Sequence, residues 1–103
     1  MSVLLEFSMF PTDKGDSVSK YVSKLIDMIR NSDFPYKLTA MGTIIETETM
    51  DEALGIVKKS HEILAEDSNR VYSSIKLDIQ KNKSNRLEGK IASIESKIGI
   101  VNK

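Results

Sequence analysis

The sequence predicts a single α+β domain in which two helices cover one face of an antiparallel β-sheet. Segments with a strand-like apolar period of two alternate along the chain with segments of helical period. The chain has 103 residues, which is the size of one domain. Hydrophobic residues make up 40% and charged residues 29% of it, so wholesale disorder is excluded. We therefore interpret residues 1–103 as one domain.

The first two predicted elements are a strand over residues 2–10 and a helix over residues 17–31. In the strand, odd-numbered apolar positions alternate with a mixed set, which places the two sets on opposite faces. Pro11 is expected to end the strand because it has no N–H to donate. Asp16 or Ser17 is expected to cap the helix by accepting an unpaired backbone N–H. The apolar stripe of this helix consists of Val18, Tyr21, Val22, Leu25, Ile26 and Ile29.

The middle segment contains two short strand-like runs, residues 36–41 and 43–47, with Gly42 alone between them. One residue is too short for an ordinary hairpin loop. Two interpretations are open: one long strand bent by a bulge at Gly42, or two strands joined by a tight turn that borrows a residue from each side. We favour one long strand bent at Gly42, or two nearly continuous strands.

The second half of the chain predicts a helix, a strand and a final helix. Thr49 and Glu52 have the spacing of a capping box, so a helix is expected over residues 50–66. His61, the only histidine, lies on its apolar stripe, where a packed core or interface residue is commoner than an acid–base catalyst. A strand follows over residues 70–80, and an amphipathic helix begins near Leu87 and ends at Gly99.

If residues 36–47 supply two strands, this order of elements is a β-α-β-β-α-β unit, the ferredoxin-like fold, with an extra C-terminal helix. Right-handed crossovers place both main helices over the odd-numbered residues of the first and last strands. No helix of the chain is expected to cover the other face, which we call the open face. A second subunit or a small ligand is expected to cover this mixed surface. Its expected members are Leu4, Glu6, Ser8, Phe10, Lys37, Thr39, Met41, Ile44, Glu46, Tyr72, Ser74, Lys76 and Asp78.

Charge balance and the absence of cysteine exclude several classes of function. Lysine and arginine total 15, and aspartate and glutamate total 15, so no net charge draws the chain to nucleic acid or to an anionic membrane. With no cysteine and one histidine, we expect no disulfide, iron–sulfur cluster or zinc site. The first residues do not resemble a signal peptide, and no apolar run is long enough to span a bilayer, so we expect a cytoplasmic location.

Two segments at the edge of the open face are candidates for a ligand pocket. Ser8 and Phe10 precede a loop that leads into a helix, although a plain strand end would also explain Pro11. Gly42 leaves backbone groups accessible beside Thr43, although a bulge that redirects the strand would also explain the glycine.

Three carboxylates, those of Glu6, Glu46 and Asp78, are expected on the open face. A pair of them could act as general acid and base, and one alone could bind a cation or a protonated heterocycle. Pairing with Lys37 or Lys76 is the simpler alternative.

The chain contains three short motifs, in this order: Glu6-Phe7-Ser8-Met9-Phe10-Pro11, Ser17-Val18-Ser19-Lys20-Tyr21-Val22 and Met41-Gly42-Thr43-Ile44-Ile45-Glu46. They resemble those of the small thiamine-binding protein family, long described as a domain of unknown function. The resemblance covers almost the whole chain, with the motifs in the same order. It implies a ferredoxin-like fold, dimers joined through their sheets, and pairs of dimers that form tetramers. It also implies binding of thiamine, chiefly through its aminopyrimidine part, with no catalysis and no cofactor.

The resemblance and the open face together nominate a set of ligand-binding residues. An aromatic ring stacks on a flat heterocycle or on the thiazolium cation, and a carboxylate favours that cation. Phe10 stands where tyrosine is common in the motif, and Thr47-Glu48 stands where a glycine often follows. The nominated residues are Glu6, Ser8, Phe10, Met41, Thr43, Glu46 and Tyr72.

The sequence thus supports two functions from different classes. The leading hypothesis is a non-enzymatic binder of thiamine or of its hydroxymethylpyrimidine moiety. The alternative is a structural or regulatory oligomer without a small ligand, in which the open face is only an interface. An enzyme is the least supported class because no nucleophile–base pair or metal cluster can be named.

Overall fold

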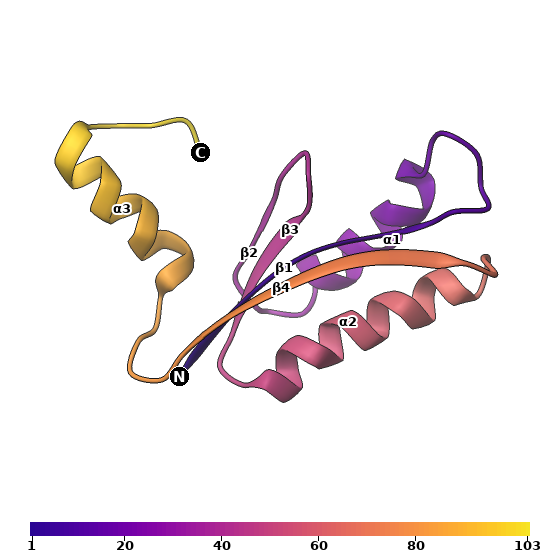
Figure 1. Cartoon of the computed structure of the whole chain (residues 1–103), viewed down its shortest axis with the longest axis horizontal. Coiled ribbons are helices and arrows are strands. Elements are labelled where there is room, and N and C mark those ends of the chain that lie inside the picture. The colour runs from indigo at the N-terminus through magenta and orange to yellow at the C-terminus, as the bar shows by residue number, and fades with distance from the viewer.

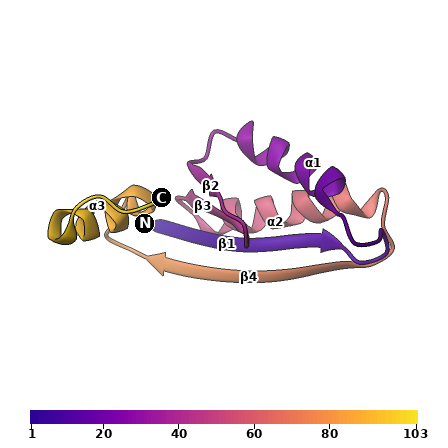
Figure 2. The same cartoon turned by 90° about the horizontal axis from the view of Figure 1, so that it is seen from above.

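The computed structural model describes the whole chain, residues 1–103, as a four-stranded sheet with three helices. The strands are antiparallel and lie in the order β2-β3-β1-β4. Helices α1 and α2 cover one face of the sheet, as Figures 1 and 2 show. The predicted ferredoxin-like α+β fold is therefore confirmed. The elements are β1 (Ser2–Pro11), α1 (Ser19–Arg30), β2 (Tyr36–Leu38), β3 (Thr43–Thr47), α2 (Met50–Ala65), β4 (Val71–Gln80) and α3 (Arg86–Ile98).

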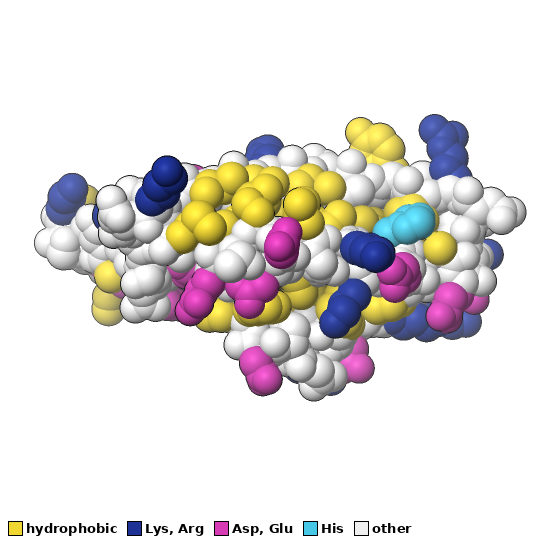
Figure 3. Space-filling model, turned by 90° about the horizontal axis from the view of Figure 1, so that it is seen from below, with side chains coloured by type: hydrophobic (Ala, Val, Ile, Leu, Met, Phe, Trp, Pro, Cys, Tyr) yellow, Lys and Arg dark blue, Asp and Glu magenta, His cyan; other side chains and the backbone are white.

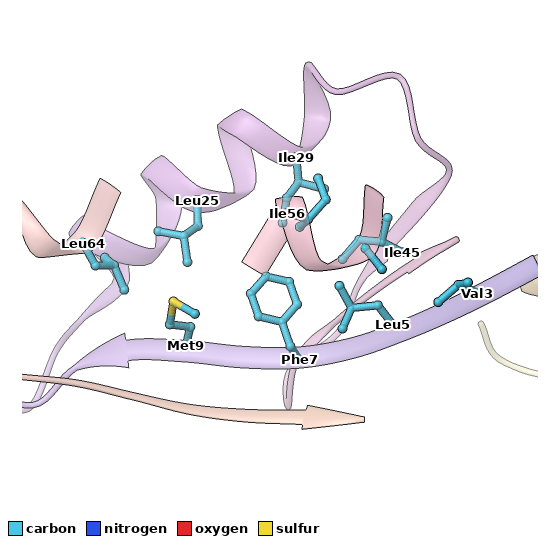
Figure 4. Close-up of a cluster of buried hydrophobic side chains, with 10 residues drawn as sticks. Val3, Leu5, Phe7, Met9, Leu25, Ile29, Ile45, Ile56 and Leu64 are labelled. Atoms are coloured by element: carbon cyan, nitrogen blue, oxygen red, sulfur yellow. The ribbon is translucent and has the colours of Figure 1, made fainter. Parts of the chain in front are cut away.

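The hydrophobic core lies between the sheet and the two covering helices (Figure 4). β1 is an inner strand, and its odd-numbered side chains point toward the helices, as their period of two predicted. Leu5, Ile29 and Ile45 have no exposed surface, so the sheet and α1 are joined by fully buried contacts. The ten core residues are Val3, Leu5, Phe7, Met9, Leu25, Ile29, Ile45, Ala53, Ile56 and Leu64.

The two helix starts differ in how well the sequence predicted them. The capping box of α2 is confirmed: the Thr49 hydroxyl accepts from the Glu52 amide at 3.1 Å, and the Glu52 carboxylate accepts from the Thr49 amide at 3.1 Å. The caps predicted for α1 are wrong, because α1 begins at Ser19 and no side chain caps it. Val18 occupies the capping position instead, and its half-buried side chain lies beside the end of β1.

Pro11 is the last residue of β1, one position beyond the predicted strand, and it still pairs with Val71 of β4. The Thr12 amide donates to the Arg70 carbonyl at 2.9 Å, so even-numbered residues of β1 exchange hydrogen bonds with β4. The backbone nitrogen of Pro11, an odd-numbered residue, is therefore turned away from β4. No strand lies on that side at this point, so the missing N–H costs no ladder hydrogen bond.

The favoured interpretation of residues 36–47, as one bent strand or two nearly continuous strands, is also wrong. β2 and β3 form a hairpin closed by a tight turn over residues 39–42, which was the second interpretation. The Thr39 amide donates to the Gly42 carbonyl at 2.9 Å, and the Thr39 hydroxyl accepts from the Gly42 amide at 3.2 Å. Gly42 allows the turn to approach the backbone of Phe7 closely, since a Cβ there would lie 3.1 Å from the Phe7 carbonyl oxygen. Its φ is not positive, so backbone strain is not the reason for a glycine.

One part of the predicted core is exposed. Ile75, Leu77 and Ile79, which we call the β4 stripe, lie on the helix side of the sheet but are 43%, 37% and 49% exposed. β4 is an edge strand, and α2 packs mainly over β1 and β3, so no helix covers the stripe. Figure 3 shows apolar side chains gathered on this side of the molecule beside α2. His61 is also exposed on α2, on the same side.

Helix α3 corrects the expectation that no helix of the chain covers the open face. Its first turn lies on that face near the start of β1, where Leu87 is buried. The rest of α3 extends away from the sheet (Figures 1 and 2) and leaves Ile94, Ile98 and the following Ile100 exposed. None of the three helices has the length and apolar character that crossing a membrane requires.

Two glycine substitutions are expected to change stability in opposite directions. Gly42→Ala places a methyl group 3.1 Å from the Phe7 carbonyl oxygen and should lower the free energy of unfolding by about 1–2 kcal/mol. Gly55→Ala, in α2, meets nothing within 4 Å and should raise it by about 1 kcal/mol because alanine favours the helix. Urea unfolding measures both. Stabilisation by Gly42→Ala would contradict the close approach.

Candidate functional site

The candidate site is a pocket of about 370 Å³ beside the far end of β1. β1 pairs with β3 only from Val3 to Phe7, and beyond this point the β2–β3 hairpin turns away from β1 (Figure 1). Helix α1 begins opposite the space that is left. The pocket therefore has three walls: residues 7–10 of β1, residues 38–43 of the hairpin, and the first two turns of α1 with the preceding Val18.

Four of the seven nominated residues line this pocket. Ser8 and Phe10 come from β1, and Met41 and Thr43 come from the hairpin, although the two segments are over thirty positions apart along the chain. Thr43 is buried, whereas Met41 is 90% exposed at the tip of the turn. The structure thus brings together the two segments that the sequence singled out.

Two further nominated residues lie next to the pocket on the open face. The ring of Tyr72 packs against Phe10 with a centroid distance of 5.8 Å and a tilt of 42°. The Glu6 side chain lies beside Gly42, since a Cβ on that glycine would be 3.9 Å from the Glu6 Cγ. Glu6 also faces Lys76 at 3.7 Å, an exposed pair across β1 and β4 that is worth little energy.

The seventh residue, Glu46, lies on the open face but away from the pocket. Its carboxylate accepts hydrogen bonds from the Ser2 hydroxyl at 2.6 Å, the Arg86 amide at 3.0 Å and the Leu87 amide at 2.9 Å. The two amides belong to the first turn of α3, whose own N-cap residue, Asn85, provides no side-chain cap. Glu46 therefore caps α3 from across the sheet.

The surroundings of Glu46 stabilise its charged form. Burial alone would raise the pKa of this carboxyl, but the hydrogen bonds from Ser2, Arg86 and Leu87, with the charge of Arg86, outweigh burial and lower the pKa below its ordinary value of 4.5. Arg86 extends the same cluster, since its guanidinium donates to the Ser2 carbonyl at 2.8 Å and pairs with Asp78 at 3.1 Å. A ligand-binding role for Glu46 stays a prediction.

Sequence reasoning missed the α1 wall of the pocket. Val22, Leu25 and Ile26 were assigned to the apolar stripe of the helix, which is correct, but that stripe is longer than the core beneath it. Its first turns extend past the end of β3 and face the pocket. The signal available in the sequence was the short β3 opposite a long β1, because a helix that covers both must overhang the shorter strand.

A larger groove of about 670 Å³ runs along the outer side of α1 but is a weaker candidate. It contains none of the seven nominated residues. Its cations are already paired: Arg30 with Asp27, and Lys24 with Asp67 at 3.1 Å. The smaller pocket combines apolar walls with the hydroxyls of Ser8, Thr39 and Thr43, which suits a flat heterocycle that carries a few polar atoms.

The sequence of the chain matches the family model described as "Thiamine-binding protein" over residues 5–95. The chain belongs to the thiamine-binding protein family. All seven nominated residues fall within the matched range.

Relatives from archaea and bacteria are similar in sequence to this chain over most of its length. A UPF0045 protein of Methanocaldococcus jannaschii is 41% identical over 92 residues, which is 89% of this chain and 91% of that protein. A UPF0045 protein of Mycobacterium tuberculosis is 34% identical over 95 residues, which is 92% of this chain and 93% of that protein.

Solved structures agree with the fold of this member of the thiamine-binding family. The M. jannaschii structure has a TM-score of 0.81 at 41% identity, covering 90% of this chain and 95% of that chain. A domain of unknown function from Bacillus cereus has a TM-score of 0.77 at 27% identity, covering 88% of each chain. A Thermotoga maritima protein, named as a candidate thiamine biosynthesis/salvage protein, has a TM-score of 0.78 at 17% identity, over 91% of this chain and 99% of that one, and shows the fold alone.

Proposed function

We propose that the protein binds thiamine, or its hydroxymethylpyrimidine moiety, in the pocket beside β1 and catalyses no reaction on it. The observation that carries the proposal is the meeting of Ser8, Phe10, Met41 and Thr43 around one cavity of about 370 Å³. The membership of the chain in the thiamine-binding family supports the choice of ligand.

The two rings of thiamine suit different parts of the site. In the proposed complex the neutral aminopyrimidine lies between the apolar α1 wall and β1, in the pocket that Ser8 and Thr43 also line. The thiazolium ring carries a fixed positive charge and extends over the open face toward Glu6 and the exposed Tyr72. A carboxylate and an aromatic face both attract such a cation.

Calorimetric titration with thiamine tests the proposal. Saturable binding is expected, together with a thermal shift, because a ligand at 100 times its dissociation constant stabilises the folded state by about 2.7 kcal/mol. Absence of both heat and thermal shift at millimolar thiamine and hydroxymethylpyrimidine would refute it.

The Ser8 hydroxyl offers a prediction with a built-in control. Ser8→Ala should weaken thiamine binding by about three- to tenfold, the effect of one neutral hydrogen bond. Ser74, the direct cross-strand partner of Ser8, does not line the pocket, so Ser74→Ala should leave the dissociation constant unchanged. Calorimetry measures the dissociation constant of thiamine for the two variants. Equal dissociation constants for Ser8→Ala and Ser74→Ala would show that Ser8 does not bind the ligand.

We also propose that the protein is a homo-oligomer, with a dimer of dimers as the expected form. The support is an exposed β4 stripe on an edge strand of ten residues, in a chain with no net charge to keep copies apart. The same stripe favours the alternative function, an oligomer with no small ligand. Ser8→Ala distinguishes the two: weaker thiamine binding with unchanged oligomer size contradicts a purely structural role. The cytoplasmic location stays a prediction.

A further inference from the structure

The polypeptide backbone of Met9 is the feature of the pocket that neither the motifs nor the side chains account for. Its side chain is buried in the core and points away from the open face. Yet Met9 lines the pocket together with Ser8 and Phe10, whose side chains lie on the opposite face of the sheet. Residues of both faces line the cavity because the cavity adjoins the edge of β1.

Successive residues of β1 direct their backbone N–H and C=O groups to opposite neighbouring strands, and this alternation gives the direction of the Met9 groups. Even-numbered residues of β1 bond to β4, as the bond from the Thr12 amide to Arg70 shows. Odd-numbered residues turn their N–H and C=O toward β3, and Val3, Leu5 and Phe7 find partners there. Continuing the register would place Met41 opposite Met9, but Met41 lies 90% exposed in the turn. The N–H and C=O of Met9 thus face the space that β3 has left.

We propose that these two groups are the recognition element for the aminopyrimidine, an inference that rests on the proposed function. The Met9 N–H donates to the ring nitrogen beside the amino group, and the Met9 C=O accepts from that amino group. The ligand occupies the place that a residue of β3 would take and completes the ladder of β1. The required chemical class is a planar ring with an acceptor nitrogen next to an exocyclic amine.

The walls on either side favour this pairing over solvation of the edge. Val22 and Ile26 of α1 supply an apolar surface against one side of the pocket, and Phe10 lies at the other end of the unpaired edge. The pairing of β3 with β1 ends at Thr43, and Gly42 next to it lines the pocket. A buried strand edge left without a partner is costly, so a ligand that lacks either group should bind weakly.

Two pyridine analogues of thiamine make a matched test of the ligand. Replacing the ring nitrogen beside the amino group by CH removes the partner of the Met9 N–H, so the dissociation constant should rise about tenfold or more. Replacing the other ring nitrogen by CH should change it little. Thiamine without its 4-amino group, which leaves the Met9 C=O unpaired, should bind as weakly as the first analogue.

Methionine-selective ¹⁵N labelling tests the protein side directly. Thiamine should move the Met9 amide resonance to lower field, whereas those of Met28 and Met50, which do not line the pocket, should stay in place. Met9→Pro, which removes the N–H, should bind more weakly than Met9→Ala, which loses the side chain alone. Proline already stands at Pro11, the last residue of β1, which like Met9 is an odd-numbered position without a β3 partner.

The outcomes separate the inference from the proposed function. Thiamine binding with equal affinities for all analogues and an unmoved Met9 amide would overturn the role of Met9 and leave thiamine binding standing. Failure of thiamine and hydroxymethylpyrimidine to bind at all would overturn both.

Discussion

Replacing Glu46 by glutamine is expected to release α3 from the sheet and to lower the free energy of unfolding by about 2–3 kcal/mol. The carboxylate accepts from three donors, and the two backbone amides among them have no other acceptor in the first turn of α3. A glutamine side chain has nearly the same shape but turns an N–H₂ group toward these donors. The loss therefore combines unsatisfied buried donors with a missing charge partner for Arg86.

Urea unfolding of wild type and Glu46→Gln measures this loss, with Glu48→Gln as the control. Glu48 is two residues further on and exposed, so its replacement should have little effect on the free energy of unfolding. Amide hydrogen exchange should show loss of protection in α3 before the rest of the chain. Equal stability of wild type and Glu46→Gln would contradict the capping role.

The stability difference between wild type and Glu46→Gln is expected to depend on pH. The folded state lowers the pKa of Glu46 below 4.5, so its carboxylate stabilises the fold at any pH above 4.5. As pH falls below this value, the carboxylate takes up a proton and this contribution is lost. The stability difference between wild type and Glu46→Gln should be constant above pH 4.5 and shrink below it. A stability difference that grows at low pH would contradict the lowered pKa of Glu46 in the folded state.

Thiamine binding by Glu46→Gln separates the two roles of this residue. An unchanged dissociation constant would leave Glu46 as a capping residue and remove it from the ligand site. A large rise in the dissociation constant, with α3 still protected from exchange, would support direct contact.

Replacing Leu77 by lysine is expected to dissociate the proposed oligomer. Leu77 is the centre of the β4 stripe, and burying a leucine in an interface contributes about 1.5–3 kcal/mol. A lysine there would also place two charges near each other across a symmetric contact and cost desolvation. Together these effects should raise the dissociation constant of the subunits at least about a hundredfold. In a lone chain the position is 37% exposed, so the fold itself should tolerate the change.

Light scattering after size-exclusion chromatography, at one fixed protein concentration, measures this result. The wild type should show a multiple of the single-chain mass and Leu77→Lys the single-chain mass. Ile94→Lys, on the exposed part of α3, is the comparison variant. If Ile94→Lys dissociates the subunits and Leu77→Lys does not, the interface lies on α3 and not on β4.

Local sequence patterns were sufficient where the physical cause is local. The period of two in β1 predicted which side chains reach the core, because successive strand residues point to opposite faces. The Thr49–Glu52 capping box was predicted because both partners lie within one turn. The motifs around Ser8 and Met41 indicated the two segments that meet at the pocket.

Tertiary structure decided what depends on where one element ends relative to another. The β2–β3 hairpin turns away from β1 on the N-terminal side of Thr43, and this leaves the pocket and the Met9 edge open. The register between β1 and β3 cannot be predicted from either strand alone. Glu46 reaches donors 40 and 41 positions away, so its capping role depended on the docking of α3. The exposure of Leu77 depended on the position of α2 over the sheet. The sequence alone therefore determined the fold class, the face of each β1 side chain and the segments of the candidate site. Long-range packing decided which backbone and side-chain groups of those segments are left without a partner.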